Sequence, residues 1–113
     1  MIKIEEAFKN KKAFIPFVLA GYPNLEATEK FILKMAEAGA DLIEIGIPFS
    51  DPVAEGTVIH AASKVALSGN MTTNDIFDMA EKLKGKVNIP LVFMTYINPI
   101  IVYGKDKFFA RCK

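Results

Sequence analysis

The spacing of hydrophobic residues alternates between two periods along this chain of 113 residues. Short, nearly continuous apolar runs at 14–19, 42–47 and 89–94 predict three strands. Between these runs, apolar residues that recur every three or four positions predict helices. The expected order is helix, strand, helix, strand, two helices, strand and helix. This order is typical of an α/β protein with a parallel sheet, because parallel strands need crossover connections.

Capping signals indicate where the helices begin and end. Helices are expected at both ends, over 2–11 and 105–113, and residues 96–99 are expected to form the loop that leaves the third strand. The helix between the first two strands should begin after the N-cap Asn24 and end at Gly39. Two further helices follow the second strand. The first has the apolar stripe Val58, Ala62, Val65 and Ala66, and the second is capped by Thr72 or Thr73.

One acidic residue, Glu44, interrupts the apolar run of the second strand. A carboxylate in such surroundings loses solvation, which costs several kcal/mol unless it is paired or protonated. A destabilising group of this kind is a candidate functional residue. Pro48 and Pro52 stiffen the loop that follows the strand, because proline fixes φ. A second acid, Glu55, lies later in the same loop, so the two carboxylates form the candidate site.

Two α/β architectures are consistent with the order of elements: a doubly wound open sheet and a (β/α) barrel. The junction at 20–24 lacks the glycine fingerprint of a dinucleotide site. In barrels, catalytic acids lie at the carboxyl ends of strands and on the loops that leave them. Glu44 and Glu55 fit that placement, which favours the barrel.

Composition and charge exclude several functional classes. The hydrophobic share of 51% and the charged share of 24% are those of a globular protein. The net charge is +1 and the basic residues are scattered, so no nucleic-acid surface is expected. No apolar run reaches the roughly 18 residues of a membrane span. One histidine and one cysteine are too few for a usual zinc site or an internal disulfide, and a cytoplasmic, reducing location is expected.

The segment 42–56, with the sequence Leu-Ile-Glu-Ile-Gly-Ile-Pro-Phe-Ser-Asp-Pro-Val-Ala-Glu-Gly, resembles the signature of the tryptophan synthase alpha chain family. The resemblance covers essentially the whole chain, and its other matches are at 14–18, 20–23, 38–41, 94–99 and 108–112. Members of that family are complete (β/α)8 barrels, or TIM barrels. The resemblance implies that residues 1–113 are the first three β/α units of such a barrel.

By this resemblance the protein is a lyase. The family cleaves indole-3-glycerol phosphate to indole and glyceraldehyde 3-phosphate by a retro-aldol reaction in tryptophan biosynthesis. The alpha chain uses no cofactor, and a beta subunit that receives the indole holds pyridoxal phosphate. The resemblance implies that Glu44 is the general acid/base, because a partly desolvated acid with a raised pKa suits proton transfer to the indole ring. It places at Glu55 the carboxylate that stabilises the charge developing at the ring nitrogen.

The same resemblance implies roles for four other residues. Phe17 and Tyr96 would help to line the indole pocket. Asp51 and Asn98 lie on segments that face the beta subunit in the family. The family match implies no metal ligand in this chain.

The chain departs from the family pattern in three respects. Glu55 stands where the family has aspartate, and its extra methylene moves the carboxylate by roughly 1 Å, a shift that can cost on the order of 100-fold in rate. The family continues Gly-Pro-x-Ile-Gln, whereas Gly56 is followed here by 57–60, Thr-Val-Ile-His. The loops after strands seven and eight, which form the phosphate site of such barrels, are absent, and 105–113 is a helical run without a stop signal. We therefore expect a truncated barrel.

Each candidate also has an interpretation without catalysis. Glu44 would pair with a lysine near the rim of the sheet, Glu55 would be a solvated loop acid, and Asp51 would cap a turn. His60 is expected to cover the start of a helix rather than to bind a ligand. Three hypotheses follow: the lyase or its inactive N-terminal part, a non-catalytic fragment or decoy that binds the beta subunit, and a fragment that self-assembles through unpaired strand edges.

Overall fold

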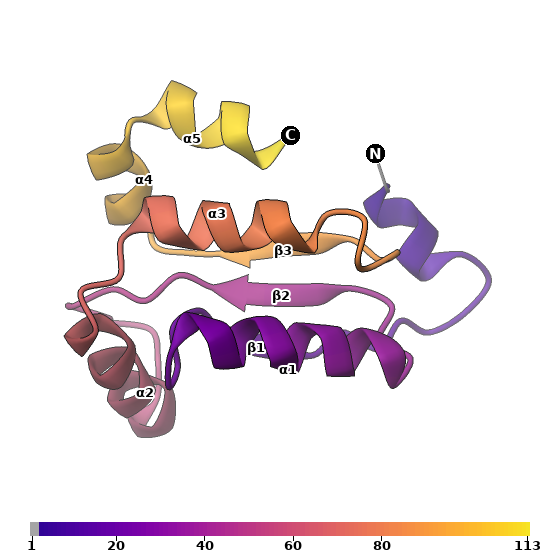
Figure 1. Ribbon diagram of the computed structural model, residues 1–113, viewed down its shortest axis with the longest axis horizontal. Helices are drawn as coiled ribbons and strands as arrows, with labels where there is room; N and C mark the ends of the chain where they lie inside the picture. Colours follow the sequence, from indigo (N-terminus) through magenta and orange to yellow (C-terminus); the bar gives the residue numbers. More distant parts are fainter. Residues whose placement is uncertain (1–2) are drawn as a thin grey trace.

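The computed structural model describes residues 3–113 and contains a parallel sheet whose three strands lie in chain order (Figure 1). The strands are β1 (Phe17–Leu19), β2 (Ile43–Gly46) and β3 (Leu91–Met94). In the register of the sheet, Glu44 is paired with Phe17 on one side and with Val92 on the other. The predicted α/β class with parallel strands is confirmed.

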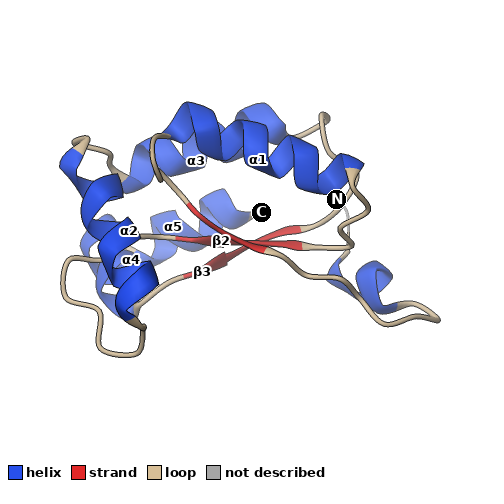
Figure 2. Ribbon diagram, turned by 90° about the horizontal axis from the view of Figure 1, so that it is seen from below, coloured by secondary structure: helices blue, strands red, loops and turns tan. Residues whose placement is uncertain are grey.

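Helices connect the strands and extend past β3. A short 3-10 helix, η1 (Ile4–Phe8), precedes β1. Figure 2 shows that α1 and α3 lie on the same side of the sheet. Figure 1 shows α4 and α5 beyond β3, on the side away from β1. The helices are α1 (Leu25–Glu37), α2 (Thr57–Ser68), α3 (Thr73–Leu83), α4 (Ile97–Tyr103) and α5 (Lys105–Cys112).

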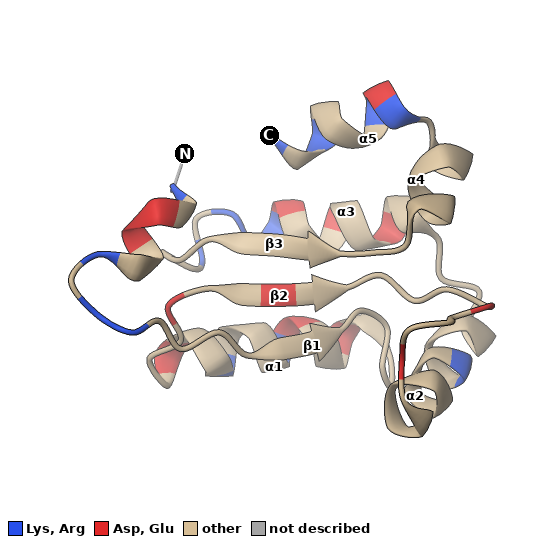
Figure 3. Ribbon diagram, turned by 180° about the vertical axis from the view of Figure 1, so that it is seen from behind, with Lys and Arg blue, Asp and Glu red and all other residues tan. Residues whose placement is uncertain are grey.

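The main core lies between the sheet and the helices α1 and α3. Ile43 and Ile45 of β2 are almost completely buried, and they pack in one cluster with Ile32 of α1 and Ile76 of α3. Because side chains alternate along a strand, Glu44 belongs to the opposite face of β2. Figure 3 shows that, among residues 3–113, no helix crosses in front of this second face, which we call the open face of the sheet. The open face carries the candidate acid, and the helix-covered face carries the core.

Local hydrogen bonds explain the helix starts. The Asn24 side chain accepts a hydrogen bond of 2.8 Å from the Ala27 N–H, which confirms the predicted N-cap of α1. At α3 the cap is Thr72 rather than Thr73. The hydroxyl of Thr72 accepts from the Asp75 N–H at 3.2 Å, and the Asp75 carboxylate accepts from the Thr72 N–H at 2.8 Å. This reciprocal capping box satisfies two N–H groups at the start of the helix.

Several predicted boundaries were wrong. The first helix is only the single turn η1, followed by Asn10 at a positive φ of 59°, and residue 2 lies outside the described residues. The first strand begins after Pro16, which has no N–H for the ladder, although its carbonyl accepts the Glu44 N–H at 3.0 Å. Residues 97–99 belong to α4 rather than to a loop. Pro99 is tolerated there because it lies in the first turn, where N–H groups have no partner within the helix.

The predicted apolar stripe of α2 was also wrong in part. Val58 is 78% exposed and Val65 is 45% exposed, whereas Ser63 and Ala66 are buried. The buried side is thus made by small residues, which let a helix approach β1 closely. The Ser63 hydroxyl has no hydrogen-bond partner within the described part of the chain.

An aromatic cluster attaches the last helices to the rest of the fold. The ring of Phe77 in α3 lies 5.2 Å from that of Phe93 in β3 and 5.1 Å from that of Phe108 in α5, measured between centroids. Arg111 of α5 pairs with Asp78 and Glu81 of α3, each at 3.0 Å. Residues 105–112 are therefore packed as a helix. None of the helices within residues 3–113 has the length and apolar character needed to cross a membrane.

Candidate active site

Glu44 lies in the middle of β2, on the open face, between its register partners Phe17 and Val92. Its side chain is half-buried. Within residues 3–113, its carboxylate takes part in no hydrogen bond and no ion pair. The non-catalytic interpretation predicted that Glu44 pairs with a lysine. No lysine within residues 3–113 forms that ion pair. This carboxylate is partly withdrawn from water and not committed to a structural contact.

Asp41, just before β2, shows what a structural carboxylate looks like in the same fold. It forms a short ion pair with Lys11 and accepts a hydrogen bond of 2.8 Å from the Phe14 N–H. The hydrogen bond from Lys11, and then that from the Phe14 N–H, lower the pKa of Asp41 below its ordinary value. The two contacts attach the segment before β1 to the start of β2. The Asp41 carboxylate thus stabilises the fold through its contacts, whereas the Glu44 carboxylate makes no such contact within residues 3–113.

The ring of Phe17 lies over Gly46, on the same face as Glu44. A methyl group added at Gly46 would lie 2.5 Å from the Cζ atom of Phe17, closer than real contacts allow. A side chain at position 46 would therefore force the Phe17 ring to move. Since Phe17 is also the register partner of Glu44, an aromatic surface adjoins the half-buried carboxylate. Phe17 thus lies beside the acid, and its role in an indole pocket stays a prediction.

The segment 47–56, which we call the β2–α2 loop, carries Glu55 and Asp51. Its first residue is held to the sheet, because the Ile47 N–H donates to the Met94 carbonyl at 2.9 Å. Glu55 and Asp51 are both exposed, and neither has an ion-pair partner within residues 3–113. Figure 3 shows the acidic segments of this loop beyond the arrowhead of β2, away from the acidic segment on the strand. In this chain, Glu55 thus lies in solvent beyond the end of the strand that carries Glu44.

Three residues near the loop differ in what they contribute. The hydroxyl oxygen of Tyr96, just after β3, accepts hydrogen bonds from the N–H groups of Val53 at 3.1 Å and Ala54 at 3.0 Å. Sequence reasoning missed these contacts and predicted only a pocket wall, because nothing in a sequence marks a hydroxyl that reaches a backbone more than 40 residues away. Asn98 is exposed in the first turn of α4. His60 lies in the first turn of α2, as predicted, where its N–H donates to Gly56.

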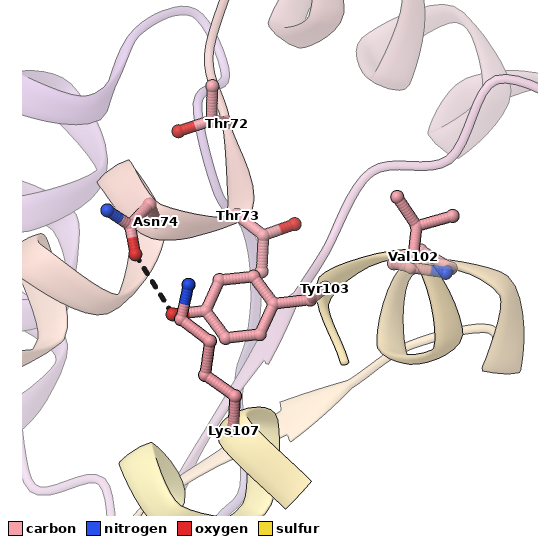
Figure 4. A pocket seen from close by; sticks show the side chains of 7 residues that line it. Thr72, Thr73, Asn74, Val102, Tyr103 and Lys107 are labelled. Carbon is pink, nitrogen blue, oxygen red and sulfur yellow. Dashed lines mark hydrogen bonds between the residues drawn. The ribbon is translucent and has the colours of Figure 1, made fainter. Parts of the chain in front are cut away.

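Two surface hollows lie elsewhere. The larger, about 570 Å³, is lined by residues of α3, α4 and α5. Figure 4 shows Tyr103 at its centre, with the phenol donating to the Asn74 side chain at 2.9 Å. The smaller, about 170 Å³, lies between α1 and the segment after α2. Neither hollow includes Glu44 or Glu55. No group of three potential ligands among the His, Cys, Asp and Glu residues of 3–113 could hold a metal ion.

Comparison with known proteins identifies what this arrangement is similar to. The profile of the family described as "Tryptophan synthase alpha chain" matches residues 4–113. The tryptophan synthase alpha chain of Lacticaseibacillus casei is 46% identical over 112 residues, which cover 99% of this chain and 42% of that protein. The chain thus spans about two fifths of the length of this relative.

Solved structures agree with the sequence match. The alpha subunit of tryptophan synthase from Legionella pneumophila superimposes with a TM-score of 0.87 at 37% identity, over 96% of this chain and 42% of that one. The tryptophan synthase complex from Pyrococcus furiosus gives a TM-score of 0.82 at 36% identity, over 88% and 41%. These likenesses confirm the prediction that the three β/α units match the N-terminal part of a (β/α)8 barrel rather than a doubly wound sheet.

Proposed function

Because the chain belongs to the tryptophan synthase alpha chain family, we propose that it supplies the N-terminal part of a lyase site for indole-3-glycerol phosphate. The proposed reaction is the retro-aldol cleavage of this substrate to indole and glyceraldehyde 3-phosphate. The observation that carries the proposal is the half-buried carboxylate of Glu44, which has no ion-pair partner within residues 3–113 and lies on the open face of the sheet beside Phe17.

In the proposed mechanism Glu44 moves protons. Its carboxylic acid donates a proton to C3 of the indole ring, and the positive charge that results is centred on the ring nitrogen. The bond between C3 and the side chain then breaks, and its electron pair returns to the ring. At the same time the side-chain hydroxyl loses its proton to the Glu44 carboxylate and becomes the aldehyde carbonyl. One carboxyl group can serve both transfers only if no other residue occupies it, which is how Glu44 differs from Asp41.

Glu55 is the proposed partner acid. It would remain ionised and stabilise the charge at the ring nitrogen. It is exposed and forms no ion pair within residues 3–113, which supports its approach to a substrate bound over the open face. Phe17 would pack against the flat indole ring, and Tyr96 would complete that wall. In this proposal, the phosphate group and the rest of the pocket belong to the later strands of a complete barrel, which lie outside this chain.

The proposed partner is a tryptophan synthase beta subunit. One of the similar structures is described as a tryptophan synthase complex. Asp51 in the β2–α2 loop and Asn98 at the start of α4 are both exposed at the carboxyl end of the strands, which supports a role in that contact. Pyridoxal phosphate would be bound by the beta subunit, with no cofactor in this chain. The proposed location is the cytoplasm.

The decisive experiment joins residues 1–113 to the remaining segment of the Lacticaseibacillus casei alpha chain and measures indole release from indole-3-glycerol phosphate. We expect the joined barrel to cleave the substrate and the 113-residue chain alone to release no indole. Turnover by the short chain would contradict the need for the late loops. A folded but inactive barrel, with the short chain still binding a beta subunit, would instead favour the non-catalytic fragment.

A further inference from the structure

The β2–α2 loop has few contacts of its own. Among residues 48–55, only the N–H groups of Val53 and Ala54 donate a hydrogen bond within residues 3–113. Both donate to the same atom, the hydroxyl oxygen of Tyr96. The side chain of Val53 is 89% exposed, so no apolar burial holds this part of the loop. The position of the residues just before Glu55 therefore depends on one oxygen atom.

Tyr96 is itself well placed to hold the loop. Its ring lies 5.4 Å from the ring of Phe49, near the start of the loop, measured between centroids. It follows β3 by two residues, and Met94 at the end of β3 accepts the Ile47 N–H. Both the start and the middle of the loop are therefore attached to the carboxyl end of β3. A rigid strand end is a better support for a functional group than the loop alone.

We propose that Tyr96 is a positioning residue for Glu55, which it controls through the backbone of Val53 and Ala54. This inference rests on the proposed function, because it assigns Tyr96 a task in the same site. The positioning role and the predicted role as a pocket wall depend on different parts of the Tyr96 side chain. A wall needs the ring, whereas positioning needs the hydroxyl oxygen. The phenol uses its acceptor capacity on the two amides and keeps only its own proton to donate.

The test on the chain itself is Tyr96→Phe, which keeps the ring and removes only the oxygen. We expect amide hydrogen exchange at Val53 and Ala54, followed by NMR, to become about tenfold faster, with exchange in β2 unchanged. Tyr22→Phe is the matched control, because Tyr22 is an exposed residue and its hydroxyl forms no hydrogen bond within residues 3–113. Unchanged exchange at both amides in Tyr96→Phe would overturn the proposal.

The second readout uses the joined barrel. We expect Tyr96→Phe to lower kcat about tenfold with KM unchanged, and to cause no further loss when Glu55 is already replaced in Glu55→Gln. A raised KM with unchanged kcat would mean a substrate contact and would overturn the positioning role. An equal loss with and without Glu55 would also overturn it. If the unmodified barrel is inactive, the proposed function fails, and the exchange experiment alone decides whether Tyr96 holds the loop.

Discussion

Replacing Glu44 by glutamine separates catalysis from folding. The glutamine side chain has nearly the same shape, and the wild-type carboxylate contributes no hydrogen bond or ion pair within residues 3–113, so no stabilising contact is lost. Substitutions away from structural contacts usually change the free energy of unfolding by less than about 0.5 kcal/mol. In the joined barrel, the same change removes the group that delivers and receives protons. We therefore expect Glu44→Gln to abolish cleavage and leave stability nearly unchanged.

Urea unfolding followed by circular dichroism measures the stability half of this prediction. With a slope of about 1.5 kcal/mol per M for a chain of this size, a change of 0.5 kcal/mol moves the midpoint by about 0.3 M. A fall of the midpoint by about 1 M or more would refute the reasoning, because it would show that Glu44 has a structural partner. Retained indole release by the Glu44→Gln barrel would remove Glu44 from the proposed mechanism.

Four further changes test other parts of the structure. In the joined barrel, Glu55→Asp should speed cleavage, by up to on the order of 100-fold if the geometry of the family applies; a slower variant would show that the site has adapted to glutamate. Asp41→Asn should lower stability at pH 7, and because the folded-state pKa of Asp41 is lowered, its stabilisation is lost as the pH falls through that value. The difference from wild type in urea titrations should therefore shrink below about pH 4, and a constant difference would contradict this. Phe77→Ala should cost about 3–5 kcal/mol in the same assay, and a loss under about 1 kcal/mol would mean that the aromatic cluster is loosely packed. Gly46→Ala should displace the Phe17 ring and raise KM in the joined barrel, and an unchanged KM would indicate that the ring does not contact substrate.

The fold was predictable where the signals are local. The alternation of strand and helix patterns, the N-cap Asn24 and the threonine cap before α3 depend on residues a few positions apart, and the structure contains all of them. The buried side of a helix depends on how the helix packs against the sheet, and it was not predictable in this way. The sequence pattern of α2 predicts Ala66 correctly, but it also favours Val58 and Val65, whereas the approach of the helix to β1 buries the small residue Ser63 instead.

The candidate site was predictable to the extent that one residue conflicts with its surroundings. Glu44 is noticeable because an acid interrupts an apolar strand, and the register of the sheet then places Phe17 beside it. The signal for Glu55 is weaker, since exposed acids are common in loops: only its place in the loop after the Glu44 strand and the family resemblance indicate it. The contacts of Tyr96 with Val53 and Ala54 could not be read from the sequence, because they join the loop after β2 to the end of β3, which only the folded sheet brings together.

The two faces of β2 have different surroundings, so we expect that residues of the candidate site can be replaced without loss of the fold. Ile43 and Ile45 face the helices and are almost fully buried, so truncating either would remove packing from the main core. Glu44 and Gly46 face away from that core, where the fold requires only that the Phe17 ring fits. A strand built in this way can therefore accept substitutions on its open face, such as Glu44→Gln, at little cost in stability. Under the proposed function, the ligand sets the constraint on that face, and this would explain an acid that has no ion-pair partner within residues 3–113.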